Sequence, residues 1–315
     1  MSNLIFSLNL VMPVFIIILF GYILRRKGIA SDAYISSATT IVYYFALPAS
    51  LFEQVSTSDF FELMNIKFVL FVVGATIAVF IVVWILAAIF IKDRSKISAF
   101  VQAVFRGNYV YVGLPITQNL LQTKVIPSTI LVIAFVLPIY NILAVIILTY
   151  YNEKKEKVNV IKLLLDIIKN PMIVAILVAI PFSLLKIKLP FAITKPIDYI
   201  GSLASPMALM LVGAGIHFDA LVKNLKYIVN ASIIKAVIQP LIIVPIAILL
   251  GFNSEQIATI FVLFSVPTAM NAYIMAKKLG GDGELSAGII VLTVILSVVT
   301  MPIGAFILKS FGLIL

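Results

Sequence analysis

Long apolar runs separated by short polar segments make up most of this chain of 315 residues. A helix needs about 20 consecutive apolar residues to span the hydrocarbon core of a bilayer. Ten runs reach or approach this length, so the pattern predicts an all-α integral membrane protein with ten transmembrane helices. The ten predicted spans are Leu4–Leu24, Ala33–Phe52, Ile66–Ile91, Ile97–Gln122, Pro127–Tyr151, Asn170–Leu185, Pro196–Ile216, Leu225–Leu250, Gln256–Lys277 and Leu285–Leu308.

The composition supports a membrane protein that is surrounded by lipid. Hydrophobic residues form 63% of the chain and charged residues only 11%, whereas about 25% of the residues in a soluble domain are charged. There is no cysteine and only one histidine, His217, which excludes disulfides, thiolate metal centres and multi-histidine sites. We therefore expect no metal, no cofactor, no catalytic residues and no nucleic-acid partner.

The positive charges alternate between the two sides of the predicted membrane. Fifteen of the 23 lysine and arginine residues fall in odd-numbered connections and six in even-numbered connections or beyond the last span. Lysine and arginine accumulate in cytoplasmic loops. This bias predicts a multi-pass protein of the cell (plasma or inner) membrane with both termini on the non-cytoplasmic side. The charged segment 152–169 is then a cytoplasmic linker, with a short interfacial helix expected from Val160.

Three pairs of prolines recur in the same order in the two halves, with spacings of 158, 158 and 152 residues. Five spans per half place the second copy upside down, so we predict an inverted 5+5 repeat of residues 1–151 and 170–315. Inverted repeats with broken helices are typical of secondary transporters, although chance spacing of common prolines is the alternative. The pairs are Pro13 and Pro171, Pro48 and Pro206, and Pro115 and Pro267.

The fourth and ninth predicted helices carry prolines near their centres, so we expect both to break and to cross each other. Breaks near Gly113–Pro115 and Val266–Thr268 would bring two half-helix N-termini, near Ile116 and Thr268, to the middle of the membrane. Such termini attract anions; two simple kinks are the alternative. The candidate substrate contacts in these helices are Asn108, Tyr109, Gly113, Leu114, Pro115, Pro267, Thr268 and Asn271.

Three further polar residues inside the predicted spans are candidate contacts. Arg106 and Lys235 each lie about 14 Å beyond the last loop lysine at 1.5 Å per residue, where a charge usually marks a pathway. Snorkelling to the interface is the alternative for both. Asn141, next to Tyr140, faces either the same cavity or a neighbouring helix. No Asp or Glu lies at the middle of a span, so a proton or sodium site built from buried carboxylates is not indicated.

The order of these motifs resembles the auxin efflux carrier family of membrane transport proteins, especially its bacterial members described as malate or malonate permeases. The resemblance covers nearly the whole chain. The matching stretches are Ala46-Leu47-Pro48-Ala49, Gly107-Asn108, Gly113-Leu114-Pro115, Asn170-Pro171, Pro206 with Gly213, Val266-Pro267-Thr268-Ala269, and Asp282 through Thr293 with Ser297 and Pro302.

The resemblance implies the ten-helix fold shared by bile-acid symporters and sodium/proton antiporters. It also implies a homodimer, a scaffold formed by spans 1, 2, 6 and 7, and a mobile transport unit formed by spans 3–5 and 8–10. A proton or sodium ion as the coupling partner follows from the same resemblance. Several relatives of this fold use buried acidic residues, which this chain lacks at mid-span, so ion coupling stays open.

Two functions of different classes fit these features. The first is a carrier for a small organic anion, such as a dicarboxylate or an auxin-like carboxylate, that works by alternating access of the elevator type. The second is a membrane receptor that binds a ligand in the same fold without moving it. An intramembrane enzyme is disfavoured because no Ser–His or Asp–Asp pair lies at depth.

Overall fold

The computed structural model describes residues 2–57, 64–123, 126–152, 165, 169–216 and 224–314. These residues are helical, and they form no strand apart from one isolated bridge between two single residues. Six helical segments are long and apolar enough to cross a membrane: 32–56, 66–90, 127–150, 191–214, 225–249 and 283–310. The described residues are therefore consistent with an all-α membrane protein. Residues 153–164 and 166–168 of the expected linker, and His217, lie outside the described residues.

The other four predicted spans coincide with shorter or interrupted helices or with the N-terminal helix, and they remain predictions as membrane spans. The helices are α1 (Ser2–Arg26), α2 (Asp32–Ile41), α3 (Leu47–Ser56), α5 (Ile66–Phe90), α6 (Arg94–Phe105), α7 (Leu114–Leu121), α8 (Pro127–Leu131), α9 (Leu137–Tyr150), α11 (Pro171–Leu184), α12 (Phe191–Ser202), α13 (Ala204–Ala214), α14 (Leu225–Ile233), α15 (Gln239–Leu249), α16 (Ser254–Ser265), α17 (Asn271–Lys278) and α18 (Gly283–Ser310).

In the described part of the chain, four wide π-helical turns each continue directly into the next helix, and each lies just before a proline; three of them also follow the preceding helix without a break. A proline ring clashes with the preceding turn and removes a backbone donor, and a wider turn gives that ring room. The turns and their prolines are η1 (Val42–Ala46) before Pro48, η2 (Tyr109–Gly113) before Pro115, η3 (Val132–Val136) before Pro138, and η5 (Ile234–Ile238) before Pro240.

This pattern corrects one prediction. The fourth helix does not break near Gly113–Pro115, because η2 continues directly into α7 there. The interruption lies instead at Arg106–Asn108, between the end of α6 at Phe105 and the start of η2 at Tyr109. The predicted half-helix start near Ile116 is therefore wrong by about two turns, whereas the ninth helix is interrupted where expected, between Ser265 and Asn271.

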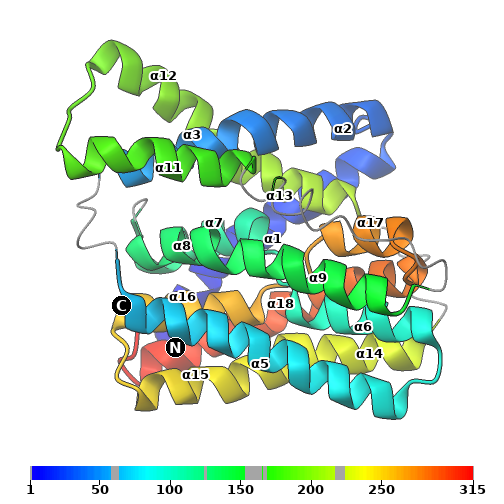
Figure 1. Cartoon of the computed structure of the whole chain (residues 1–315). Helices are drawn as coiled ribbons and strands as arrows, with labels where there is room; N and C mark the ends of the chain where they lie inside the picture. The colour runs from blue at the N-terminus through cyan, green and yellow to red at the C-terminus, as the bar shows by residue number, and fades with distance from the viewer. Residues whose placement is uncertain are drawn as a thin grey trace.

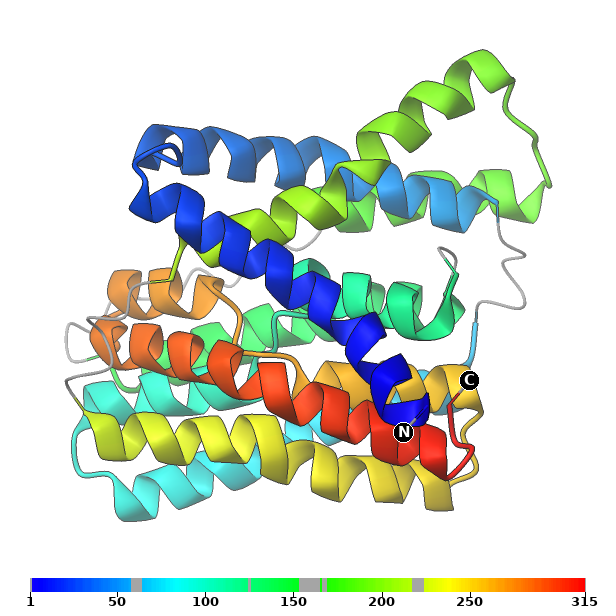
Figure 2. The same cartoon turned by 180° about the vertical axis from the view of Figure 1, so that it is seen from behind.

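The helices form two groups, with α1 running obliquely between them (Figures 1 and 2). One group contains α2, α3, α11, α12 and α13, and the other contains α5–α9 and α14–α18. The helix α1 packs against α13 of the first group and against α18 of the second. The helix α1 therefore links the two groups, beside direct contacts of α13 with η2 and of α11 with η3.

Glycines allow the closest approach, between α1 and α13. A Cβ atom added at Gly21 would lie 2.0 Å from the Met210 carbonyl oxygen, and one at Gly213 would lie 1.7 Å from that of Ile18. Contacts of small residues that bring two helix backbones together are a main source of stability between helices in lipid. The sequence places both glycines where only a hydrogen atom fits.

Gly213→Ala should destabilise the protein by roughly 1–3 kcal/mol, because the added methyl group forces α1 and α13 apart. The measurement is the thermal unfolding midpoint in detergent. Gly74→Ala on α5 is the matched control, since nothing lies within 4 Å of a methyl group there; it should be neutral or stabilise by about 0.5–1 kcal/mol. Equal midpoints for the two variants would contradict the close packing.

Candidate functional site

The two helix interruptions lie against each other and satisfy each other's backbone. The Asn108 N–H donates to the Pro267 carbonyl at 2.8 Å, and the Ala269 N–H donates to the Arg106 carbonyl at 3.0 Å. These bonds flank an antiparallel bridge between Gly107 and Thr268. Buried backbone groups must find partners, and here each interrupted helix supplies them to the other. We call this arrangement the paired break.

Side chains from both interrupted helices and α18 hold the paired break in place. The Thr268 hydroxyl donates to the Ala103 carbonyl of α6 at 2.7 Å, and the Thr268 N–H donates to the Thr293 hydroxyl of α18 at 3.1 Å. At Gly107 an added Cβ would lie 2.8 Å from the Val266 side chain and 3.1 Å from the Leu263 carbonyl oxygen. Gly107 and Thr268 are thus needed for the shape of the paired break.

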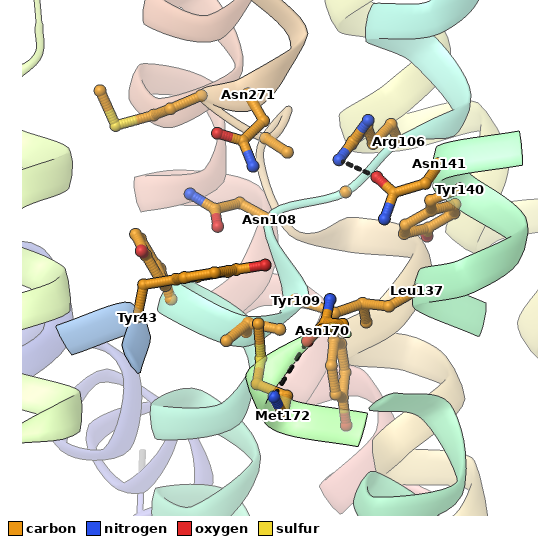
Figure 3. Close-up of a pocket in the computed structure, with 15 residues that line it drawn as sticks. Tyr43, Arg106, Asn108, Tyr109, Leu137, Tyr140, Asn141, Asn170, Met172 and Asn271 are labelled. Atoms are coloured by element: carbon orange, nitrogen blue, oxygen red, sulfur yellow. Dashed lines mark hydrogen bonds between the residues drawn. The ribbon is translucent and has the colours of Figure 1, made fainter. Parts of the chain in front are cut away.

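A cavity of about 160 Å³ opens beside the paired break (Figure 3). Arg106 to Tyr111 and Ala269 to Asn271 form one wall, while Leu137, Tyr140 and Asn141 of α9 close one side. The other helix group contributes Tyr43 of η1, Asn170, which caps the N-terminus of α11, and Met172. The cavity therefore lies at the boundary between the two helix groups.

The wall formed by the paired break carries positive potential. Arg106 is only 7% exposed, and its guanidinium donates to Asn141 Oδ1 at 2.7 Å and contacts Met275 Sδ at 2.8 Å. None of the ion pairs found in the described part of the chain involves Arg106. The first N–H groups of a helix lack intrahelical partners, and the residues that open η2 at Tyr109 line the cavity.

The amide side chains of Asn108 and Asn271 face each other across the cavity (Figure 3). Asn108 precedes η2, but its side chain makes no capping hydrogen bond to that helix. Each amide offers two donors and one acceptor oxygen. Together with Arg106 they make a cavity wall that is rich in hydrogen-bond donors and suited to an acceptor such as a carboxylate.

Tyr140 contributes a donor that the sequence did not single out as a contact. Its hydroxyl is buried and donates no hydrogen bond, and the Gly107 N–H approaches the phenolic oxygen. In that contact Gly107 would be the donor, so the phenolic proton would still lack an acceptor. Buried polar groups without partners are uncommon, and one that lines a cavity is available to whatever fills it.

The structure brings together some of the predicted contacts and separates others from the cavity. Asn141 both lines the cavity and accepts a hydrogen bond from Arg106 at the end of a neighbouring helix, so the two alternatives for it hold together, and the Arg106 side chain is buried. The residues that line the cavity are Arg106, Asn108, Tyr109, Asn141 and Asn271. The residues outside the lining are Gly113, Leu114, Pro115, Pro267, Thr268 and Lys235.

Four polar side chains of the lining were not among the predicted contacts, namely Tyr43, Tyr111, Tyr140 and Asn170, and Gly107 was not among them either. Asn170 carried a signal, because Asn before Pro171 marks a helix start, but its approach to the paired break is a tertiary feature. Within the described residues, no three His, Cys, Asp or Glu side chains come together as metal ligands.

A comparison with protein families matches residues 6–304 to a family described as membrane transport protein. The match covers nearly the whole chain. This chain belongs to the membrane transport protein family. The resemblance to auxin efflux carriers is thereby confirmed, and a multi-pass membrane protein that handles a small molecule in a lipid environment follows.

Relatives of this membrane transport protein extend over almost its full length. A protein of Rhizobium meliloti (strain 1021), provisionally named a malonate transporter, is 27% identical over 312 residues and covers 96% of each chain. An uncharacterized transporter of Methanocaldococcus jannaschii is 23% identical, covering 96% of this chain and 99% of its own. The uncharacterized transporter YfdV of Escherichia coli (strain K12) is 22% identical, covering 96% and 98%.

Two tyrosine variants should separate a ligand-facing hydroxyl from a structural one. Tyr140→Phe should leave the stability of the empty protein unchanged or slightly higher, because the removed hydroxyl has no partner. Tyr109→Phe should cost about 1 kcal/mol, because the Tyr109 hydroxyl lies 2.8 Å from the buried Thr129 hydroxyl. Thermal unfolding without added anions measures both, and a larger loss for Tyr140→Phe would contradict the assignment.

Proposed function

We propose that this membrane transport protein is a secondary carrier that moves a small organic anion across the cell membrane. The observation that carries the proposal is the cavity beside the paired break, where the buried Arg106 guanidinium has no carboxylate partner among the described residues. An uncompensated buried cation is costly, and a bound anion would offset that cost. A cationic substrate would meet Arg106 and find no counter-charge.

The proposed contacts follow from the cavity wall. Arg106 and the Tyr140 hydroxyl donate to the anion, and the amides of Asn108 and Asn271 orient it. Tyr109 also lines the cavity, but the Tyr109 hydroxyl is already hydrogen-bonded to the Thr129 hydroxyl. We propose a structural role for Pro267 and Thr268, which shape the paired break.

Alternating access is supported by where the cavity lies. The group that contains the paired break provides most of the lining, and the other group provides Tyr43, Asn170 and Met172. We propose that α1, α2–α3, α11 and α12–α13 form a scaffold along which the other group moves, as in an elevator. In this proposal the halves 1–151 and 170–315 are inverted repeats whose interrupted helices cross. Both termini lie outside the cytoplasm. Two copies of the chain form a dimer through the scaffold.

The size of the cavity favours a short anion. About 160 Å³ accommodates a dicarboxylate of malonate size better than a large aromatic acid, and a relative is provisionally named a malonate transporter. Counterflow of labelled malonate in proteoliposomes tests the proposal, with an aromatic acid as the competing substrate. Saturable malonate binding without exchange would favour the receptor alternative instead.

Asn108→Ala should weaken anion binding about 5- to 150-fold, because the loss of one directional partner costs about 1–3 kcal/mol. The measurement is a binding titration in detergent with malonate, repeated with aromatic acids. The variant must keep the wild-type unfolding midpoint for the comparison to count. Wild-type affinity in a folded Asn108→Ala protein would place the binding site elsewhere.

Arg106→Gln should reduce anion affinity by roughly 10- to 150-fold, since a hydrogen bond to a charged partner is worth about 1.5–3 kcal/mol. Arg94→Gln is the matched control, because Arg94 begins the same helix and donates to the Tyr150 carbonyl away from the cavity. That control should bind the anion as wild type does. Equal losses in both variants would mean that general positive charge, rather than the cavity, attracts the anion.

A further inference from the structure

A second buried cationic side chain lies against Gly107 of the paired break and outside the lining of the cavity. Lys235 belongs to the π turn η5 and is completely buried. Its amine makes one hydrogen bond, to Gln239 Oε1 at 3.3 Å. Gln239 is held in turn, because its Nε2 donates to the Val104 carbonyl near the end of α6 at 2.9 Å. The amine is thus fixed in position by a neutral partner.

Gly107 lies next to both this amine and the cavity. A Cβ atom added at Gly107 would lie 3.1 Å from the Lys235 Nζ, and Gly107 itself lines the cavity. An anion held by Arg106 and Asn108, on either side of Gly107 in the sequence, would therefore bind near the Lys235 amine. In the low dielectric of a buried site, attraction between opposite charges is much stronger than in bulk water.

No charged side chain in the described residues compensates Lys235. The helices packed against η5 are α6, α14, α15, α16 and α18, and α15 carries no titratable group. Apart from Arg106, which follows α6, the titratable groups on the other four lie in the first two turns or the last turn, whereas Lys235 is near the middle of its helix. They are Arg94 and Lys96 on α6, Lys226 and Tyr227 on α14, Glu255 on α16, and Glu284 and Lys309 on α18.

Glu255, one of the two acidic residues on these helices, is engaged elsewhere. Glu255 Oε1 accepts from the backbone N–H of Ser128 at 3.0 Å and from its hydroxyl at 2.7 Å. Burial of an unpaired ammonium is so costly that such a group tends to lose its proton instead. Lysine can do this, whereas arginine stays protonated in proteins. Arg106 is therefore a fixed charge, and Lys235 is a charge that can change.

We propose that Lys235 is a proton-binding site whose protonation is coupled to anion binding in the cavity. When the anion enters, the neutral amine takes one proton from water and becomes an ammonium. When the anion leaves on the other side, the ammonium returns that proton to water. One proton then accompanies each anion, and the amine ends each cycle neutral. The proposal rests on the proposed function, because it needs an anion in this cavity.

Coupling of this kind is reciprocal. If the anion favours the charged amine, protonation must favour the anion by the same factor. Anion affinity should therefore fall as the pH rises through the range in which Lys235 loses its proton, by up to about tenfold per pH unit for one linked proton. A lysine that only fills space would produce neither proton uptake nor this pH profile.

The test is proton uptake by the purified full-length protein in detergent. Malonate is added in a weakly buffered solution with a pH-indicator dye, above the second pKa of malonate, so that the acid itself binds no proton. The wild type should take up close to one proton per malonate bound. Lys235→Arg should bind malonate without proton uptake and with an affinity that no longer depends on pH, and Lys235→Gln should bind more weakly, also without uptake.

A second variant keeps the test decisive if the Lys235 variants do not fold. Gln239→Met removes the acceptor of the ammonium, so its affinity should fall at lower pH than that of the wild type. Thr76→Val on α5 is the control, since the Thr76 hydroxyl is buried and bonds only within its own helix; it should leave the pH profile unchanged.

Wild-type protein that binds malonate without proton uptake would overturn the proposal. So would full uptake by Lys235→Arg, or an unshifted pH profile for a folded Gln239→Met. These outcomes differ from failure of the proposed function, in which the wild type neither binds nor exchanges malonate or any other acid. Anion transport and proton coupling at Lys235 are therefore tested by different measurements.

Discussion

Everything in the centre of this protein depends on how two interrupted helices satisfy their backbones where there is no water. Each interruption frees N–H and C=O groups that would cost several kcal/mol each if left unpaired in hydrocarbon. The bonds from Asn108 to Pro267 and from Ala269 to Arg106 meet that need by pairing one interruption with the other. The position of each helix therefore depends on the other. The paired break also fixes where the side chains next to it lie.

The same paired break explains why two cations can lie inside an apolar protein. The helices α6 and α16 both end there, and helix C-termini carry partial negative charge. Arg106 precedes Gly107 and the Lys235 amine lies next to Gly107, so each benefits from these ends without an acidic partner among the described residues. This compensation is partial, since a helix end offers about half a unit charge, and it leaves room for an anionic ligand to provide the remainder.

The sequence was sufficient for the helical pattern and for the ninth-helix interruption, but not for the fourth. Pro267 breaks its helix, whereas Pro48, Pro115, Pro138 and Pro240 are each accommodated by a π turn. A proline therefore does not by itself distinguish a break from a wider turn. The fourth helix breaks at Gly107 because Thr268 and Val266 pack against that glycine, and this is a tertiary contact that no local pattern contains.

The residues that line the cavity could likewise be predicted only in part from the sequence. Arg106, Asn108, Asn141 and Asn271 could be found from their unusual polarity within apolar runs, but Tyr43 and Asn170 come from the other helix group. If that group is a stationary scaffold, its contacts change during transport, while Arg106, Asn108 and Lys235 move as one body because the paired break joins them. The charge that attracts the anion and the amine that accepts a proton would then cross the membrane together, so coupling would need no signal between distant sites.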